Sequence, residues 1–377
     1  MAGQLIQRGP RTWVVRISLG RRPDTGKRHY FNRTVHGAKK DAERVLHAVL
    51  RERDLGTLVE GNRITVSEYL DQWLANAARA RVRERTHRDY ADVLARYVRP
   101  ALGAQRLTQL RPLEIQGLYT QLQERGLSPR TIRCVHSVLG AALRQAVKWR
   151  LLSENPAGFV DLPRMRRPET QVLSPEEVTR FLAVAKADRY GTVFAMALGT
   201  GMRPGEYLGL RWADVDLEQG RVVVQRAVVW HQGTWTLAEP KTPRSRRTIP
   251  LPPSLVRLLG EHRRAQAVQR LAAGPRYQNL DFVFTTEVGT PVELRNLAQR
   301  HFKAILKAAG LQSALRLYDL RHTSATLLLA AGEHPKVVSE RLGHASITLT
   351  LDTYSHVLPT MQQQAAERLE QALFATP

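Results

Sequence analysis

The sequence is poor in cysteine and in acidic residues, and it has no long apolar run. Its 377 residues include one cysteine, Cys134, which excludes a disulfide framework and a zinc site built on a cysteine cluster. No apolar stretch reaches the length of a membrane-spanning helix, and the N-terminus lacks the apolar core of a signal peptide. We therefore expect a cytoplasmic protein. Cys134 lies at a position that a helix could bury, and we expect it to be a small core residue.

Basic residues outnumber acidic ones by a wide margin. The chain has 57 Lys+Arg against 34 Asp+Glu, a net charge of +23. Residues 1–168 carry 32 basic and 15 acidic side chains, so +17 of the net charge precedes residue 169. Such a charge indicates a polyanionic partner, and nucleic acid is the leading one. A cationic membrane-surface protein is the alternative, but it requires a basic amphipathic helix or a lipidation signal, and we find neither.

Three short motifs near the C-terminus combine residue types that suit phosphoryl chemistry. They are Y-D-L-R-H-T, R-L-G-H-A-S-I and Y-S-H, which contain Arg321, His344 and Tyr354. A guanidinium can bind two phosphate oxygens through charge-assisted hydrogen bonds. A phenol oxygen can act as a nucleophile, and a histidine can hydrogen-bond a phosphate or move a proton. These three residues are therefore candidates for a phosphate-handling site.

The order and spacing of these motifs resemble the C-terminal signature of the tyrosine recombinases, the phage integrase family. Tyr354 follows the histidine of L-G-H-A-S-I by ten residues and is flanked by D-T and S-H. The resemblance implies that Tyr354 attacks a DNA phosphate, which gives a 3′-phosphotyrosine and a free 5′-hydroxyl. Arg321 and His344 would stabilise the negative charge of the transition state. No metal, nucleotide or other cofactor is implied, because the covalent link keeps the phosphodiester energy.

The motif G-M-R-P-G-E resembles the family's segment with the first catalytic arginine. Thr200-Gly201 is typical of a turn, and Pro204 suits the first position of a helix. Arg203 would then point away from the core at the start of that helix, with Glu206 one turn later on the same face. The resemblance implies that Arg203 binds the scissile phosphate. From its place on the same face, we expect Glu206 to support Arg203 by orienting the arginine or the helix.

The motif P-K-T-P-R-S-R-R-T-I-P-L resembles the family's lysine hairpin. Residues 221–230 and 235–237 are predicted to pair as a hairpin around Gly233, before a further strand over 247–251. Lys241 lies at the edge of the turn between them. The resemblance implies that its ammonium group is the general acid that protonates the leaving 5′ oxygen.

The chain departs from the family pattern at Tyr318, where the family most often has histidine. A tyrosine hydroxyl can hydrogen-bond a phosphate but does not titrate near neutral pH. Tyr318 is therefore a candidate site residue, with simple packing as its alternative role. Asp319 is expected to cap a helix that runs through residues 327–329 and has Arg321 in its first turn. His322 is expected to support the fold.

The segment around His344 gives two conflicting signals. Gly343 is predicted to end a helix in the left-handed conformation, which leaves His344 on a turn. The alternation of Ile347, Leu349 and Leu351 is typical of a strand. The resemblance instead implies that Tyr354 lies on a short helix, and we follow the resemblance.

The N-terminal region is predicted to form a small basic DNA-binding module. Residues 11–19 and 28–35 alternate as two strands, and residues 37–54 form an amphipathic helix. This ββα arrangement resembles the arm-binding domain of many integrases, whose strands can enter a DNA groove. A solvated basic hairpin without sequence preference is the alternative. The candidate DNA contacts in this region are Arg16, Arg22, Lys27, Arg28 and Arg33.

Residues 64–149 are predicted to be entirely helical. Apolar residues recur at helical spacing, and Ser128 followed by Pro129 is typical of a helix start. The four-helix layout resembles the family's core-binding domain, whose arginines mostly contact phosphates. The candidate contacts here are Arg81, Arg83, Arg85, Arg88, Arg130 and Arg133.

These features together predict a multidomain, mainly α protein with small β-sheets. The expected parts are a ββα-type arm-binding domain (1–58), an all-α core-binding, SAM-like four-helix domain (62–165), a mixed α+β catalytic domain (170–360) and a C-terminal tail helix (361–377). Ser174, with Glu177 three residues later, is predicted to form a capping box near the start of the catalytic domain. In the family, similar tails dock on the next subunit.

The resemblance implies a site-specific recombinase that integrates or excises a phage or mobile element. Its partners would be double-stranded DNA attachment sites of core and arm type, and host DNA-bending or excision proteins. On the DNA it would assemble as a homotetramer. It would act in the bacterial cytoplasm, associated with the nucleoid, and would not bind a membrane. A type IB topoisomerase is one alternative, although the N-terminal hairpin argues against it. A non-catalytic DNA-binding regulator is the other, and it predicts no dependence on Tyr354.

Overall fold

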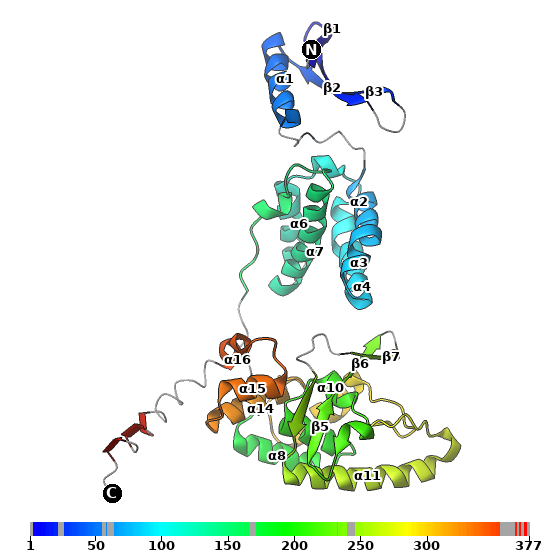
Figure 1. Ribbon diagram of the computed structural model, residues 1–377, viewed down its shortest axis with the longest axis vertical. Helices are drawn as coiled ribbons and strands as arrows, with labels where there is room; N and C mark the ends of the chain where they lie inside the picture. Colours follow the sequence, from blue (N-terminus) through cyan, green and yellow to red (C-terminus); the bar gives the residue numbers. More distant parts are fainter. Residues whose placement is uncertain are drawn as a thin grey trace. The chain divides into compact units, whose positions relative to one another are not determined.

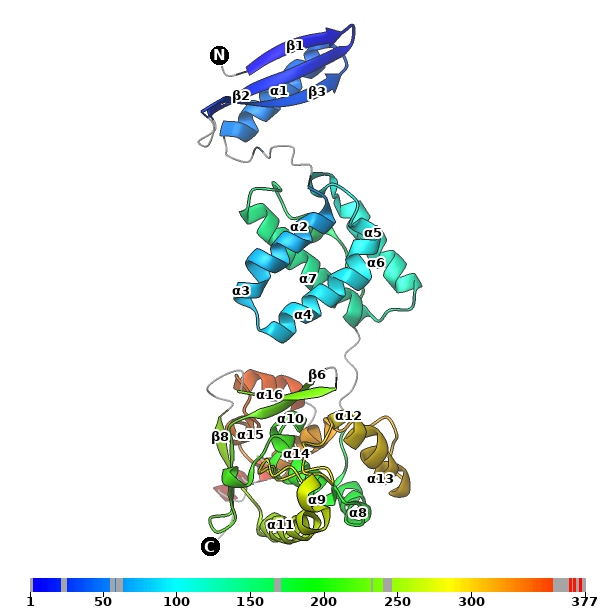
Figure 2. The same cartoon turned by 90° about the vertical axis from the view of Figure 1, so that its right-hand side faces the viewer.

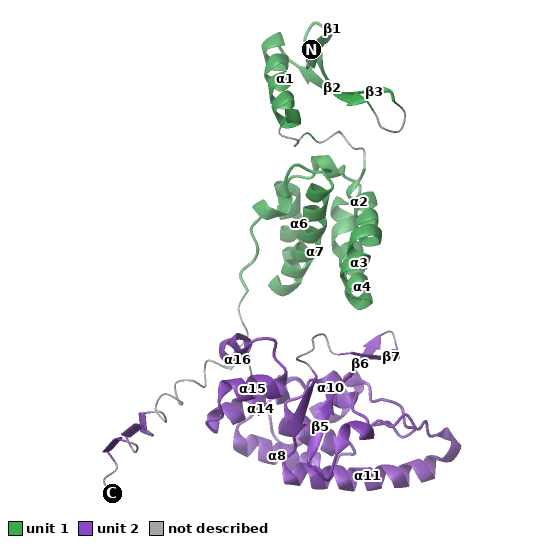
Figure 3. Cartoon of the chain, in the orientation of Figure 1, with its two compact units in different colours: residues 1–167 green, residues 168–377 purple. Residues whose placement is uncertain are grey.

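The computed structural model describes most of the chain, in two compact units that comprise residues 1–167 and 168–377 (Figure 3). The described residues are 3–21, 26–54, 58, 64–165, 171–231, 233–239 and 246–354, with 366–367, 369–370 and 373–374. Within these ranges, no helix has both the length and the apolar character needed to cross a membrane. The predicted fold class, mainly helical with small antiparallel sheets, is confirmed.

The N-terminal module is a three-stranded antiparallel sheet with one helix packed on it (Figure 1). Val15 and Ile17 of the central strand and Val49 of the helix are fully buried and form its core. The first strand was not predicted from the sequence, because Leu5 and Ile6 are adjacent and break the alternation. The elements are β1 (Gly3–Gly9), β2 (Thr12–Arg21), β3 (Arg28–His36) and α1 (Lys39–Asp54).

The rest of the first unit consists of four helical runs around a second, separate core, as predicted (Figure 2). The fourth run begins at Pro129, and the Ser128 side chain caps it by accepting from the Thr131 N–H. The runs and short turns are α2 (Val66–Trp73), η1 (Leu74–Ala78) and α3 (Arg79–Arg81); α4 (Glu84–Val93), η2 (Leu94–Val98) and α5 (Arg99–Leu102); η3 (Leu107–Gln109) and α6 (Pro112–Glu124); and α7 (Pro129–Lys148) followed by η4 (Pro156–Phe159).

The prediction that Cys134 is a core residue was wrong. Its neighbours Ile132 and Val135 are buried on the inner face of α7, whereas Cys134 is exposed on the outer face. One residue along a helix rotates the side chain by about 100°, so residues next to a buried stripe point outward.

The second unit begins with four helical elements, which bury an extended apolar core. The capping box is confirmed, because the Ser174 hydroxyl accepts from the Glu177 N–H and the Ser174 N–H donates to the Glu177 carboxylate. Gly201 ends the second of these helices with φ 65°, a left-handed conformation that favours glycine. The elements are α8 (Pro175–Ala185), α9 (Gly191–Thr200), α10 (Pro204–Leu208) and η5 (Trp212–Asp214).

Two small sheets follow, and they correct the predicted hairpin. Residues 221–230 do not form one strand, because the chain leaves one sheet at residue 224 and enters another at residue 227. The first sheet has the order β4-β5-β8, with β4 (Val215–Asp216), β5 (Arg221–Val224) and β8 (Arg247–Pro250). The second pairs β6 (Ala227–His231) with β7 (Thr234–Ala238).

The C-terminal helices bring the sequence motifs together. Helix α14 packs against α9 and α15, and α15 packs against α16 and β8 (Figure 1). Residues 347–354 are helical rather than extended, as the family resemblance implied. The remaining elements are α11 (Pro253–Ala273), η7 (Gly274–Arg276), α12 (Leu294–Asn296), η8 (Leu297–Phe302), α13 (Lys303–Ala308), α14 (Asp319–Ala330), α15 (Pro335–Leu342) and α16 (Ile347–Tyr354). The described residues of the predicted tail, 366–367, 369–370 and 373–374, are helical and exposed.

A matched pair of leucines in α11 tests where the core lies. Leu259 is fully buried, whereas Leu271 is 82% exposed. We expect L259A to lower the free energy of unfolding by about 2–5 kcal/mol, because it leaves a cavity. We expect L271A to change it by less than about 0.5 kcal/mol. Urea unfolding of both variants measures this, and equal losses would contradict the packing described here.

Candidate functional site

Arg321 is a buried cation that joins the ends of two helices. It lies in the first turn of α14 and is 2% exposed. Its Nη1 donates to the Gly201 carbonyl at 2.7 Å and its Nη2 to the Leu342 carbonyl at 2.8 Å. These carbonyls lie at the C-terminal ends of α9 and α15, where the backbone carries partial negative charge and lacks helical partners. Burial, with the charge of Arg203 in second place, lowers the pKa of Arg321 to about 10, so the group stays protonated at neutral pH.

Arg203 lies beside Arg321 but is more accessible. Its Nη2 donates to the Gly343 carbonyl at 3.2 Å. Gly343 directly follows Leu342, whose carbonyl accepts from Arg321. Its Nη1 donates to Glu206 Oε1 at 2.9 Å, as predicted from their spacing. The Arg203 side chain is 35% exposed. An anion can therefore approach this guanidinium without displacing its carboxylate partner.

Glu206 lies between two guanidinium groups. It is nearly buried, and besides Arg203 it accepts from Arg247 Nη2 at 2.8 Å. Burial by itself would raise the pKa of Glu206, but the hydrogen bonds and charges of Arg247 and Arg203 outweigh it and hold that pKa below its usual range. The three arginines carry three positive charges against this one carboxylate. The cluster therefore has an excess of positive charge that suits a phosphate.

His344 stands on the turn after α15 and is partly buried. Gly343 takes φ 67°, the predicted left-handed cap. The Nδ1 of His344 lies 2.7 Å from the hydroxyl of Thr350, a buried residue of α16. Burial, followed by the charges of Arg321 and Arg203, lowers the pKa of His344 to about 3. Its imidazole is therefore neutral at physiological pH.

Tyr354 is the last residue of α16, so its backbone position follows from that helix. Thr350 precedes it by four residues, about one helical turn. Because Thr350 contacts His344, the helix that carries Tyr354 is joined to the arginine cluster. The sequence did not single out Thr350, although a polar residue within an apolar stretch was the available signal. Lys241 lies outside the described residues.

The cap predicted for Asp319, next to Tyr318, was wrong. Tyr318 is 39% exposed, and its ring packs edge-on against His322 at 5.3 Å between centroids. The buried Asp319 does not cap α14. It accepts instead from the N–H and the guanidinium of Arg316, which closes the preceding turn. The sequence cannot separate these two roles, because an aspartate at a helix start suits either one.

The N-terminal candidates divide between the two faces of the sheet. The Arg16 Nε donates to Asn32 Oδ1 at 3.0 Å, and its guanidinium lies over the Tyr30 ring. Arg28 shares this outer face by strand alternation. Arg33 pairs with Val15 in the register and so belongs to the face that α1 covers. Lys27 is exposed, and Arg22 lies outside the described residues.

The candidates in the helical module form two groups. Arg81, Arg83, Arg85 and Arg88 are exposed around the junction of α3 and α4, and Arg81 reaches Gln145 near the end of α7. Arg130 and Arg133 lie near the start of α7, roughly 20 Å away along the helix. Arg133 is also occupied by the Pro163 carbonyl at 2.9 Å. These six arginines therefore do not form a single patch.

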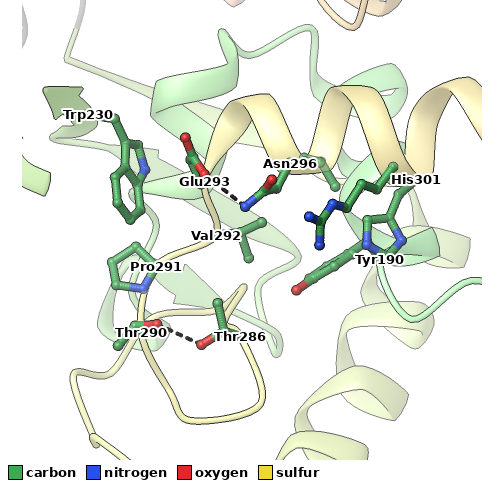
Figure 4. A pocket seen from close by; sticks show the side chains of 11 residues that line it. Tyr190, Trp230, Thr286, Thr290, Pro291, Val292, Glu293, Asn296 and His301 are labelled. Carbon is green, nitrogen blue, oxygen red and sulfur yellow. Dashed lines mark hydrogen bonds between the residues drawn. The ribbon is translucent and has the colours of Figure 1, made fainter. Parts of the chain in front are cut away.

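A cavity of about 280 Å³ lies in the second unit and contains none of the predicted site residues (Figure 4). One side is formed by Trp230 and Pro291, and another by Tyr190 packed against His301. His301 is paired with Asp188 at 2.8 Å. Across the described ranges, no group of three or more histidine, cysteine or carboxylate side chains is arranged to hold a metal ion.

Two family profiles match the chain. Residues 171–361 match the phage integrase family, and residues 65–123 match the N-terminal SAM-like domain of phage integrases. A "Tyrosine recombinase XerC-like" protein of Caldanaerobacter subterraneus is 31% identical, with 97% of each chain covered. The ICEBs1 integrase of Bacillus subtilis is 30% identical, with 69% of this chain and 70% of its own covered.

Solved structures share the fold. The Tn1549 transposon integrase in complex with a circular intermediate DNA has a TM-score of 0.68 at 23% identity, covering 81% of this chain and 99% of its own. A lambda integrase tetramer bound to a Holliday junction has a TM-score of 0.58 at 17% identity, covering 93% and 94%.

The low pKa of His344 predicts a histidine that stays neutral at pH 5 in the DNA-free protein. An unfolded histidine has a pKa near 6.5. As the pH falls below about 6.5, His344 is therefore protonated in the unfolded state but not in the folded state. Its contribution lowers the free energy of unfolding progressively as the pH falls towards 3. Histidine ¹⁵N–¹H spectra, assigned with H344N, measure the protonation state. A titration midpoint at or above pH 6 would contradict the burial described here.

Proposed function

The chain belongs to the phage integrase family, and we propose that it is a site-specific DNA recombinase that cleaves and rejoins strands through Tyr354. The observation that carries the proposal is the convergence of Arg203 and Arg321 on the consecutive carbonyls of Leu342 and Gly343, directly before His344. Guanidinium groups held in this way form a preassembled binding site for one phosphate. Integration or excision of a phage or mobile element is the biological outcome.

In the proposed reaction, the hydroxyl oxygen of Tyr354 attacks the scissile phosphorus. The P–O5′ bond breaks, which leaves a 3′-phosphotyrosine and a free 5′-hydroxyl. Arg203 and Arg321 bind the non-bridging oxygens, on which negative charge accumulates in the transition state. Removing one such preorganised donor typically costs about 10²–10³ in rate. Attack by the 5′-hydroxyl of a partner strand on the phosphotyrosine then forms the new phosphodiester and releases the tyrosine.

Four further residues handle protons or hydrogen bonds in this scheme. With Nδ1 of the neutral His344 turned to the Thr350 hydroxyl, Nε2 is the ring nitrogen left to meet a phosphate oxygen, and it donates to that oxygen in the tautomer that carries the proton on Nε2. Lys241 is the proposed general acid for the leaving 5′ oxygen. Tyr318 is a lesser candidate; its exposure supports contact with DNA rather than burial in the core. Glu206 acts by holding Arg203.

Double-stranded DNA is the partner, and its attachment sites are of core and arm type in the proposed scheme. The excess charge supports this, since +17 of the net +23 precedes residue 169. We propose a homotetramer on paired sites, with a four-way junction between the two strand exchanges. A site of action at the bacterial nucleoid, in the cytoplasm, follows from the substrate. Host DNA-bending or excision proteins are further proposed partners.

Replacing Tyr354 by phenylalanine tests the nucleophile. We expect Y354F to form no covalent adduct on a nicked duplex that carries the core site, because phenylalanine has no attacking oxygen. Binding to the same DNA should stay within about twofold, since one hydroxyl makes a small contribution to a large charged interface. Denaturing gels measure the adduct, and mobility shifts measure binding. Undiminished adduct would favour another nucleophile, and loss of binding would favour a structural role for Tyr354.

Changing the leaving group shows whether Lys241 acts by donating a proton or only through its positive charge. We expect K241A to slow adduct formation by about 10²-fold or more on ordinary DNA. Sulfur in place of the bridging 5′ oxygen should restore most of the rate, because a thiolate leaves without being protonated. Single-turnover kinetics on both substrates measure this. Equal slowing on the two substrates would contradict the role of general acid.

A further inference from the structure

Arg247 is a buried arginine that joins separate parts of the proposed site. It is the first residue of β8, and its side chain is 7% exposed. Nη2 donates to Glu206 Oε2 at 2.8 Å, and Nη1 lies 3.4 Å from Oε1. Nε donates to the Arg341 carbonyl in the last turn of α15 at 2.6 Å. One planar guanidinium therefore spans a carboxylate on α10 and a carbonyl near the end of α15.

The glycine before His344 lies against this guanidinium. A Cβ added to Gly343 would lie 2.9 Å from Arg247 Nη1 and 3.1 Å from its Cζ. Gly343 also takes φ 67°, which side chains rarely adopt. The turn that presents His344 is therefore shaped both by its own backbone conformation and by the arginine beneath it.

Both acceptors of Arg247 are close to proposed catalytic groups: Glu206 contacts Arg203, and the Arg341 carbonyl precedes the turn of His344. Glu206 Oε1 accepts from Arg203, and Oε2 accepts from the Arg203 backbone N–H. The Arg341 carbonyl lies three residues before His344. Arg341 itself donates to the Gly199 carbonyl of α9 at 2.7 Å and to the Pro250 carbonyl of β8 at 3.2 Å, so α15 is joined to β8 a second time and to α9 as well.

We propose that Arg247 is a positioning residue for recombination, an inference that rests on the proposed function. Arg247 fixes Arg203 and the His344 turn relative to one another. It does not touch the reacting phosphate in this role. A catalytic geometry that shifts by about 1 Å can lose roughly 10²-fold in rate. Lysine cannot replace this arginine, because a single ammonium cannot donate to Glu206 and to the Arg341 carbonyl with fixed planar geometry.

The test compares R247K with a matched control in the same unit. Arg226 pairs with the buried Asp214, and neither is among the proposed site residues. We expect R247K to slow single-turnover adduct formation at saturating DNA by about 10²-fold. Its affinity for the DNA should stay within about twofold. R226K should react at close to the wild-type rate. Melting temperatures of both variants, with assays run well below them, show that the protein is folded.

A double-mutant cycle with Glu206 separates positioning from general stability. If Arg247 acts through Glu206, the pair E206Q and R247K should lose little more than the slower single variant, because each breaks the same contact. Multiplied losses would contradict the proposal, as would equal rates for R247K and R226K. If R247K does not fold, R247Q takes its place, since its amide cannot span both acceptors. A wild type that forms no adduct would overturn the proposed function itself and this inference with it.

Discussion

A single carboxylate, that of Glu206, holds two guanidinium groups together in the second unit. Like charges about 4 Å apart repel by roughly 4 kcal/mol near a protein surface. Glu206 offsets this repulsion by accepting hydrogen bonds from Arg203 and Arg247. Arg321 is held separately, by carbonyls at the ends of two helices. The positive charge of the cluster is thus stabilised by groups behind it, and the side that faces solvent through Arg203 remains available to an anion.

This arrangement explains why the fold and the chemistry depend on the same contacts. Two of the carbonyls that hold Arg203 and Arg321, those of Gly343 and Leu342, belong to the turn that presents His344. The Thr350 contact joins that turn to the helix of Tyr354. A phosphate that enters the site meets donors already in place, so little reorganisation accompanies the build-up of charge in the transition state. The low pKa of His344 fits the same picture, because burial and then the charges of the neighbouring arginines disfavour a further positive charge on this histidine.

Local signals predicted much of this from sequence, and long-range contacts account for what was missed. Caps at Ser128, Ser174 and Gly343 depend on a few adjacent residues and were predicted correctly. The alternation at 347–351 favours a strand, but packing of α16 on α15 overrides it. The break between β5 and β6 and the contact of Arg247 with Glu206, 41 residues apart, depend on tertiary structure that no local pattern contains. The exposure of Cys134 differs, because its place beside the buried stripe of α7 is a local signal that the prediction overlooked.

The central claim is that one phenol oxygen becomes bonded to DNA phosphorus beside the arginine cluster. Mass spectrometry of the protein trapped on its attachment DNA, after digestion with nuclease and protease, locates that bond. The account predicts a single modified peptide, with a nucleotide linked through its 3′-phosphate to Tyr354. A nucleotide found on Tyr318 or on any other tyrosine, or linked through a 5′-phosphate, would contradict it.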